Sequence, residues 1–478
     1  MTITDRTTDP VALAAPAPRV ELPNLPALCV QRLDSLLDEW HVIEAVSGCV
    51  SALGTVRGTE VVAFATDPGI QGGALGIDSC GAISRATDLA LIRELPVVGI
   101  WHSGGARLKE GVASLVGVAQ VFAAQTRASG KVLQVSVVLG PAAGGAAYGP
   151  ALTDVIIMGP DGRIFVTGPD VVRRVTGEDV DMERLGGVVT HGEVSGVAHL
   201  VAPTDDEALY AARRLIGLVA TPQLTMHETS SVRDPRALVP TDPRKSYDVR
   251  PVVQAVLDPG SYLELHRNYA TSAVTMLGRL GGRAVGVVAN DPQTLAGCLD
   301  AATGDKTARF VHFCDSMGLP LLFLVDVPGY LPGVNQEDSG VLRRGAKLLH
   351  AYAGATVPRL TVILRKAYGG AFIAMGSKGL GADHVLAWPG AQVDVMGALA
   401  AVEVLNRRQL NESKNPAERA ALVQRLAAEH ETTTGGLARA LDCGAIDEVI
   451  EPETTRERLI ALLETMPATR GRRANGPL

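Results

Sequence analysis

The stretch Leu95-Pro-Val-Val-Gly-Ile-Trp101 occurs a second time in this chain, with small changes, as Leu319-Pro-Leu-Leu-Phe-Leu-Val325. Each copy is an uninterrupted apolar run of strand length that follows a proline, and Pro96 and Pro320 are 224 positions apart. Continuous apolar runs of this length are typical of strands that are buried on both faces of a sheet. The repeated stretch therefore predicts that one α/β unit occurs twice in the chain.

Other features recur at nearly the same offset. Gly58 and Gly282 are 224 positions apart, and Ala143-Gly-Gly-Ala-Ala147 corresponds to Tyr368-Gly-Gly-Ala-Phe372 with an offset of 225. An acidic residue and an apolar run follow each glycine pair. Because order, chemistry and spacing all persist, we interpret the chain as a duplicated domain. We expect one copy over residues 1–230 and the other over 231–478, with the junction in the charged, proline-rich stretch 228–243.

Strand-length apolar runs alternate with helical patterns in both copies. We expect strands at 61–65, 96–101, 133–139, 284–289, 320–326 and 360–364, and helices at 79–94, 110–128, 300–317, 338–355, 418–430 and 454–464. Buried strands joined by helices predict an α/β fold with right-handed crossovers in each copy.

Composition narrows the class of protein. The chain has 478 residues, 46% of them hydrophobic and 20% charged, which is typical of a globular enzyme with more than one core. The net charge is −7, and the short basic tail 470–473 is expected to be solvated, so nucleic acid is not an expected partner. The uncharged stretch 132–153 contains Gln134, Pro141, Pro150 and several glycines, so we do not expect a membrane span.

The six cysteines form no C-x-x-C pair and have neither a zinc-ribbon spacing nor the density of a disulfide scaffold. Residues 1–10 contain Asp5, Arg6 and Asp9 and no apolar core of a signal peptide. We therefore expect a cytoplasmic protein with reduced thiols, and no metal site.

Two glycine turns lie at equivalent places in the two copies. Gly144-Gly145-Ala146 follows a predicted strand and opens a short helix, and Gly370-Ala371 does the same in the second copy. Residues without bulk let the backbone approach a ligand, and free N–H groups at a helix start donate to developing negative charge, as in an oxyanion hole. Such glycines also serve plain tight turns. Two paired turns in a duplicated domain favour the oxyanion hypothesis.

A third glycine turn, Ser103-Gly104-Gly105-Ala-Arg107-Leu-Lys109, follows the strand 96–101. Arg107 and Lys109 are candidates for phosphate contacts, and a solvated position is the alternative. The spacing is not that of a phosphate-binding P-loop. No nucleophile elbow stands beside a plausible triad, His102 is interpreted as a turn residue, and neither Gly-Gly turn holds an Asp or Glu. The chemistry is therefore expected to rely on backbone donors, with a base that is not a side chain.

Four segments taken together resemble a known family. Residues 99–111 (GIWHSGGARLKEG), 144–154 (GGAAYGPALTD), 326–333 (DVPGYLPG) and 365–371 (RKAYGGA) are closely similar to the β subunits of acetyl-CoA and propionyl-CoA carboxylases, and the resemblance extends over about residues 30 to 470. It implies two tandem crotonase-like (ClpP/crotonase) domains and a homo-oligomer in which dimers assemble into a hexamer.

The resemblance also implies roles for individual residues. The amides of Gly144 and Gly145 would hold the thioester oxygen of acyl-CoA, and those of Gly370 and Ala371 the ureido oxygen of biotin. The biotin anion left after CO2 release would then remove the α-proton of the acyl group, and the enolate would attack CO2. An apolar Ile373 in the acyl pocket would suit acetyl or propionyl groups. The further substrate-binding residues implied are Ser103, Gly104, Gly105, Arg107, Ala146, Tyr148, Tyr368 and Gly369.

The chain has no Met-Lys-Met biotin attachment site and no ATP site of the carboxylase type. The resemblance therefore implies carboxybiotin carried by a partner, a biotinylated α subunit with biotin carboxylase and carrier domains, and a coenzyme A thioester as substrate. Each site would be shared across a dimer interface. The zinc ribbon of split bacterial versions is missing, and the region before Gly54 lacks the basic helical start of longer members.

Three alternatives stay open. A carboxyltransferase of a biotin-dependent decarboxylase would have the same fold and turns. A duplicated crotonase-type hydratase or isomerase would want a carboxylate at a turn, and the two dipeptides are unequal. A scaffold without activity would not need both turns.

Overall fold

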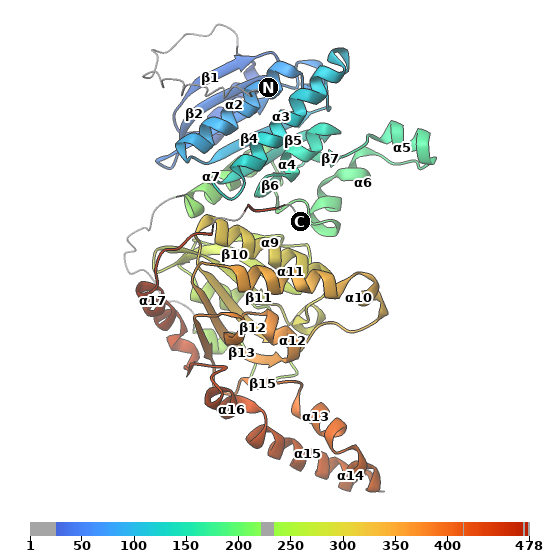
Figure 1. Cartoon of the computed structure of the whole chain (residues 1–478), viewed down its shortest axis with the longest axis vertical. Coiled ribbons are helices and arrows are strands. Elements are labelled where there is room, and N and C mark those ends of the chain that lie inside the picture. Colours follow the sequence, from blue (N-terminus) through green and yellow to red (C-terminus); the bar gives the residue numbers. More distant parts are fainter. Residues whose placement is uncertain (1–24, 221–233, 414, 472–473, 477–478) are drawn as a thin grey trace, which may run out of the picture.

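The computed structural model describes residues 25–220, 234–413, 415–471 and 474–476. Two eight-stranded sheets, each with its own helices, are stacked along the long axis of the molecule (Figure 1). The first half ends with α7 (Asp205–Val219), and the second begins with η4 (Pro235–Leu238). The expected boundary between residues 230 and 231 falls outside the described residues, so its position stays a prediction.

The first sheet has the strand order β1-β2-β3-β4-β5-β6-β8, with β7 paired to β5. Its pairs β1/β2 and β2/β3 are antiparallel and the remaining pairs are parallel. The strands are β1 (Trp40–Val46), β2 (Cys49–Val56), β3 (Thr59–Thr66), β4 (Val97–Ser103), β5 (Gln134–Ala143), β6 (Val155–Met158), β7 (Arg163–Phe165) and β8 (Leu200–Val201). The helices are α1 (Ala27–Leu36), α2 (Ile77–Arg93), α3 (Val112–Ala128), α4 (Gly145–Ala151), α5 (Pro169–Thr176), α6 (Met182–Gly186) and α7.

The second sheet repeats this topology. Its order is β16-β14-β13-β12-β11-β10-β9, with β15 paired to β13, and the hairpin strands β9 to β11 are again antiparallel. The strands are β9 (Leu263–Leu265), β10 (Ala273–Leu280), β11 (Arg283–Asn290), β12 (Leu321–Val327), β13 (Arg359–Tyr368), β14 (His384–Ala387), β15 (Gln392–Asp394) and β16 (Glu448–Val449). The helices are α8 (Arg250–Val256), α9 (Ala301–Met317), α10 (Val334–Asp338), α11 (Val341–Gly354), α12 (Gly369–Ala374), α13 (Ala398–Leu405), α14 (Arg407–Glu412), α15 (Pro416–Thr433), α16 (Gly436–Asp442) and α17 (Thr455–Thr465).

The duplication and the predicted strands and helices are confirmed, with ends shifted by a few residues. Helix α9, for example, starts where the Asp300 side chain accepts a hydrogen bond from the Thr303 amide at 2.7 Å, a regular N-cap. The antiparallel hairpins β1/β2 and β9/β10 were not predicted. They make each sheet mixed instead of purely parallel.

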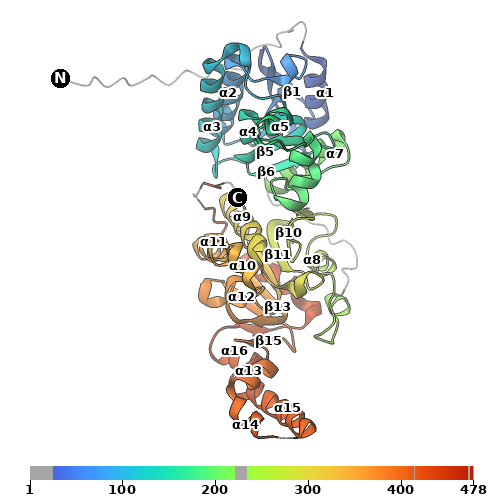
Figure 2. The same cartoon turned by 90° about the vertical axis from the view of Figure 1, so that its right-hand side faces the viewer.

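Successive side chains of a strand point to opposite faces of its sheet, so apolar residues of one strand pack on both faces. In β3, Val61, Ala63 and Ala65 pack in one buried cluster, and Val62 and Phe64 pack in another against α2 and α3. The first of these clusters continues across the seam to Phe310 and Phe313 of α9 in the second half. Helix α9 lies at this seam in both views, beside the C-terminal end of the chain (Figure 2). The two halves therefore share part of one core.

Helical arms leave both halves after the short strands β7 and β15. In the second half the arm is made of α13 to α15 and has a small core of its own, with Val402, Leu410, Val423 and Ala427. Among the described residues no helix has both the length and the apolar character that crossing a membrane requires.

Candidate active site

The two glycine turns are strand-to-helix corners. Strand β5 ends at Ala143, Gly144 turns the chain with φ +58°, and α4 begins at Gly145. Strand β13 ends at Tyr368, and Gly369 turns the chain with φ +57°. The neighbouring short strands pair with the same position in each half, since Phe165 faces Ala143 and Asp394 faces Tyr368. Gly144 and Gly369 are 225 positions apart, which is the offset between the two copies, and they are therefore equivalent residues.

A β-bulge displaces the end of each strand that leads to a corner. Between β4 and β5 the register jumps from Trp101 opposite Val138 to Ser103 opposite Ala142. Between β12 and β13 it jumps in the same way, from Val325 opposite Ile363 to Val327 opposite Ala367. Bulges of this kind re-aim the end of a strand, and they are common beside active sites.

Different side chains hold the two bulges. In the second half the Asp326 carboxylate accepts hydrogen bonds from Arg365 Nε at 2.8 Å, Tyr247 Oη at 3.0 Å and the Lys366 amide at 3.2 Å. Burial, and then the adjacent Asp326 carboxylate, raise the pKa of Tyr247 well above its usual value. In the first half His102 takes the equivalent place, and its Nδ1 lies 3.5 Å from the Arg32 guanidinium.

The amide of Gly144 is not free. It donates to the carbonyl oxygen of Phe165 at 3.0 Å, as part of the contact between β5 and β7. This bond corrects the expectation that Gly144 is one of two donors at the first corner. The next two amides, of Gly145 and Ala146, start α4 and have no carbonyl one turn back to accept their protons. The Ala147 amide already bonds the Gly144 carbonyl oxygen at 3.1 Å.

The donors of the second corner match this corrected pair. Adding 225 to Gly145 and Ala146 gives Gly370 and Ala371, the two residues expected to be donors there. Ala146 and Ala371 are both fully buried. The two corners differ in crowding at the first donor, because a Cβ on Gly145 would lie 3.1 Å from Val118 Cγ1, whereas a Cβ on Gly370 would meet nothing within 4 Å.

The third glycine turn packs against the first corner. A Cβ on Gly105 would lie 3.0 Å from the Ala143 carbonyl oxygen, and the Gly105 amide donates to Ser103 Oγ at 3.2 Å. The Gly104 amide donates to the Gly72 carbonyl oxygen at 2.9 Å. Ser103 is buried and does not bond its neighbour His102, whose amide bonds Thr66 Oγ1. These residues shape the corner, and substrate contact by them stays a prediction.

The Arg107 side chain is bonded to other groups of the protein. Its guanidinium donates to Glu110 Oε1 at 2.8 Å and to the Ser47 carbonyl oxygen at 3.3 Å, and only 7% of the residue is exposed. A phosphate could reach this side chain only if these bonds were broken. Lys109 in the same turn is exposed and is the cation of this turn that solvent reaches.

The remaining predicted residues lie around the corners. Tyr148 and Ile373 project from α4 and α12 and are each 48% exposed. Tyr368 precedes Gly369, and its hydroxyl donates to Gln392 Oε1 of β15 at 2.7 Å. Burial, followed by the charges of Glu431 and Asp394, raises the pKa of Tyr368 to about 12, so it stays a neutral hydrogen-bonding group at ordinary pH.

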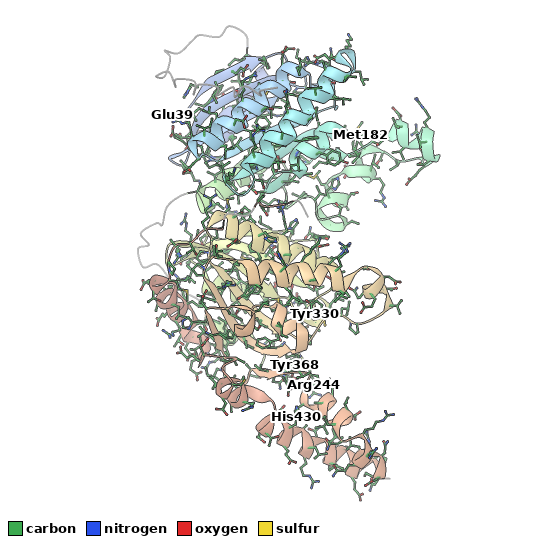
Figure 3. The ribbon with its side chains drawn as sticks, in the orientation of Figure 1. Glu39, Met182, Arg244, Tyr330, Tyr368 and His430 are labelled. Carbon is green, nitrogen blue, oxygen red and sulfur yellow. The ribbon has the colours of Figure 1, made fainter. Side chains whose placement is uncertain are left out.

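Two histidines, one beside each corner, were not predicted. His430 Nε2 lies 2.9 Å from the Asp394 carboxylate at the end of β15, close to Tyr368 (Figure 3), and His191 Nε2 lies 2.6 Å from the Ile164 carbonyl oxygen of β7. Each ring also has a hydroxyl four residues on, Thr434 and Ser195, bonded to Nδ1. The short strands that flank both corners are thus anchored in the same way. The sequence carries only the spacing His-x3-Ser/Thr, which is too short to identify them.

Among the described residues there is no cluster of His, Cys, Asp and Glu side chains that would suit a metal ion. What the corners offer chemically is hydrogen-bond donation from paired backbone amides. Donors of this kind stabilise an oxygen that becomes negative during a reaction.

Comparison with known proteins agrees with this geometry. Residues 42–474 match the carboxyl transferase domain family. The chain is 54% identical, over 437 residues, to a protein of Mycobacterium tuberculosis named biotin-dependent acetyl-/propionyl-coenzyme A carboxylase beta6 subunit, covering 90% of this chain and 92% of that one. It is 48% identical to the propionyl-CoA carboxylase beta chain of Rhodococcus erythropolis, covering 98% of this chain and all of that one.

A solved structure has the same fold. The crystal structure of transcarboxylase 12S, described as a hexamer with methylmalonyl-coenzyme A and methylmalonic acid bound, superposes with a TM-score of 0.86 at 40% identity and covers 94% of this chain and 92% of its own. The expected crotonase-like duplicated fold is thereby confirmed. The chain belongs to the carboxyl transferase domain family, among the carboxyltransferase subunits of acyl-CoA carboxylases.

Proposed function

We propose that this chain transfers a carboxyl group from carboxybiotin, carried by a partner subunit, to the α-carbon of acetyl-CoA or propionyl-CoA. The products are malonyl-CoA or methylmalonyl-CoA, which are building blocks for fatty-acid synthesis and related pathways. The observation that carries the proposal is the pair of equivalent corners, each presenting two adjacent backbone amides. A transfer between two substrates that each place negative charge on one oxygen needs two such sites.

The first corner takes the acyl-CoA. Gly145 and Ala146 donate to the thioester oxygen and stabilise the negative charge that develops there when the α-proton leaves. Gly144 contributes through its positive φ, which turns the chain from the end of β5 into α4, so that these two amides stand at the start of the helix. Tyr148, one turn farther along α4, lines the same corner, and Lys109 is the candidate for the coenzyme A phosphates.

The second corner takes biotin. Its residues fit the group, because the two amides match those of the first corner and the space above Gly370 is open. Carboxybiotin supplies CO2 and, once CO2 has left, a base for the α-proton. Gly370 and Ala371 hold the ureido oxygen, and Gly369 provides the turn. The absence of an Asp or Glu from both corner motifs, 143–147 and 368–372, supports a base that comes from this group.

The chain needs partners for this reaction. Carboxybiotin is presented by a biotinylated α subunit with biotin carboxylase and carrier domains. The site is completed by a second copy of this chain in a dimer, and dimers assemble into a hexamer; the similarity to the hexameric transcarboxylase 12S supports this arrangement. The apolar residues Leu108, Val112, Val395 and Leu405, exposed around the two corners and on the arm, suit such an interface.

The test is a carboxylation assay. The complex with purified biotinylated α subunit is given bicarbonate, ATP and acetyl-, propionyl- or butyryl-CoA, and carboxylated product is measured. We expect ATP-dependent carboxylation of the two short thioesters. If the complex only decarboxylated malonyl-CoA or methylmalonyl-CoA, the chain would instead belong to a decarboxylase. Addition of water to crotonyl-CoA would assign it to the hydratases.

A further inference from the structure

The end of α4 that lies away from the first corner is held by side chains. The carbonyl oxygen of Gly149 accepts from Gln125 Nε2 at 3.0 Å, and that of Pro150 accepts from Thr153 Oγ1 at 2.7 Å. Beyond the end of α4 at Ala151, the carbonyl oxygens of Thr153 and Asp154 in the connection to β6 accept from one guanidinium nitrogen of Arg309, at 2.9 Å and 3.3 Å. The last carbonyls of a helix have no partner within the helix, so the bonds to Gly149 and Pro150 fix where α4 ends, and Arg309 fixes the connection that leads from α4 to β6.

Arg309 belongs to the other half of the chain. It lies 155 residues beyond Asp154 in α9, the helix at the seam between the two sheets (Figure 2), and its guanidinium bonds the Asp154 carbonyl oxygen of the first half. Only 6% of the residue is exposed. Its other terminal nitrogen bonds the Gly476 carbonyl oxygen, and Asn475 Nδ2 donates to the Asp154 carboxylate at 2.8 Å. Burial lowers the pKa of Arg309, while nearby Asp154 raises it, and an arginine in this setting stays charged.

The surroundings of Arg309 leave it little freedom. One turn earlier in α9, the buried Lys306 ammonium donates to the carbonyl oxygens of His266, Tyr269 and Ala273 at 3.0, 2.8 and 2.6 Å. Asp154, His199, His266 and Arg309 line a small cavity between the two halves. The position of Arg309, and with it the connection from α4 to β6, is therefore set by the packing of the second half.

The second corner is held differently. Asp154 and Asp383 are equivalent, since their carboxylates accept from the first residues of β5 and β13, the Gln134 and Arg359 amides, both at 2.8 Å. The carbonyl oxygen of Asp383 accepts from Lys378 Nζ at 2.7 Å. Lys378 lies in the same half as its corner and is partly exposed. Within the part of the chain that the structure describes, the first corner depends at this point of the fold on a cation from the opposite half, and the second corner does not.

We propose that Arg309 is a positioning residue for the acyl-CoA corner, through which the biotin half of the chain holds the connection that follows the helix whose first amides bind the thioester oxygen. This inference rests on the assignment of substrates to corners in the proposed function. Arg309 does not touch the substrate. It acts by fixing the connection that leaves α4 at the end opposite to Gly145 and Ala146, and a shift of that helix by a fraction of an ångström moves both donors together.

The experiment compares Arg309→Met, Arg309→Lys and Lys378→Met in the complete complex with the α subunit. For each variant, kcat and KM are measured separately for propionyl-CoA and for the carboxylated carrier, together with the melting temperature. We expect Arg309→Met to reduce kcat/KM for propionyl-CoA by about tenfold or more while the KM for the carrier stays unchanged. Arg309→Lys keeps a donor for the carbonyls and should recover part of the loss, and it remains informative if the methionine variant does not fold.

Lys378→Met is the matched control and should affect the carrier more than propionyl-CoA. Equal losses for both substrates, in proportion to the fall in melting temperature, would show that Arg309 only fastens the two halves, and would overturn the inference. Unchanged propionyl-CoA parameters in a folded Arg309→Met variant would overturn it as well. If Arg309→Met changed only the carrier KM, and Lys378→Met only that of propionyl-CoA, the substrates would be assigned to the wrong corners, which is a failure of the proposed function.

Discussion

Tyr148 of α4 and Ile373 of α12 occupy the same position in the two halves, three residues beyond the first free amide of each corner. They are 373 − 148 = 225 positions apart, and each is 48% exposed. Half-exposed apolar side chains at equivalent places beside both corners suit a surface that a substrate or a second copy of the chain completes. The two residues differ in size and polarity.

The first prediction concerns acyl-group choice. Replacing Ile373 with Asp should lower the preference for propionyl-CoA over acetyl-CoA by about tenfold, because in the dimer the second corner of one copy completes the acyl-CoA site of the other, and the longer acyl chain would meet a charge where an apolar surface now stands. Steady-state kcat/KM values for the two thioesters measure the effect. Ile92→Asp, on an exposed face of α2, is the control for an added surface carboxylate. An unchanged preference in Ile373→Asp would remove this residue from the acyl pocket.

The second prediction concerns the turns themselves. Gly144→Ala and Gly369→Ala each force a Cβ into a region with φ near +58° and should cost about 1–3 kcal/mol of stability. Gly369→Ala should be the more destabilising, since its Cβ would lie 2.9 Å from the Val395 carbonyl oxygen, whereas at Gly144 the nearest atom is 3.8 Å away. The melting temperatures of both variants are compared with that of Gly379→Ala, a control with open space around it, and they show the order of stability. Equal melting temperatures for all three would contradict it.

The third prediction concerns the Asp326 bulge. Asp326→Ala leaves the Arg365 guanidinium and the Tyr247 hydroxyl without their shared acceptor, and removal of one partner of a buried pair costs about 3–5 kcal/mol. Glu60→Ala removes the partner of Arg93 in an exposed pair and should cost less than about 1 kcal/mol. Denaturant titration of the two variants measures the difference. Similar losses in both would mean that Asp326 does not hold the bulge.

The fourth prediction is a pH dependence of stability. Burial, and then the nearby Lys306 charge, lower the pKa of His266 to about 3, from 6.5 in an exposed histidine. Between about pH 6.5 and 3 the unfolded chain therefore binds a proton that the folded chain does not, so stability falls on acidification, by up to about 1.4 kcal/mol per pH unit. His266→Asn, chosen because asparagine tolerates the positive φ at this position, should flatten the dependence. Unfolding at pH 5 and pH 7 measures it. An unchanged slope would contradict this account of His266.

The sequence predicted the features that follow from periodicity and repetition. The offset of Pro96 and Pro320 located equivalent strands, and apolar runs located the buried ones. The hairpins β1/β2 and β9/β10 escaped because polar residues and glycine interrupt the apolar runs of their strands, as Ser51 and Gly54 do in β2 and Thr275 and Arg279 do in β10, although nearly every residue of β2 and β10 is buried.

The glycine turns were located from the sequence, and donation from their amides to a substrate stays a prediction. A Gly-Gly pair indicates that the backbone must turn and approach a ligand, yet it does not show which glycine turns the chain and which donates. The structure separates these roles, since the Gly144 amide is used by Phe165. The role of Arg309 had no signal in the sequence, because its partners are backbone carbonyls from a distant segment.

The central claim is that backbone amides at the two corners bind two different substrates. Gly370→Val tests it most directly, because a Cβ there meets no atom within 4 Å, whereas a Cβ at Gly145 would lie 3.1 Å from Val118 Cγ1. Carboxylation of propionyl-CoA is measured with the complete complex containing the biotinylated α subunit, beside the affinity of the variant for propionyl-CoA. We predict native stability, unchanged propionyl-CoA affinity and carboxylation reduced by about a hundredfold or more. Carboxylation at the wild-type rate would contradict the account.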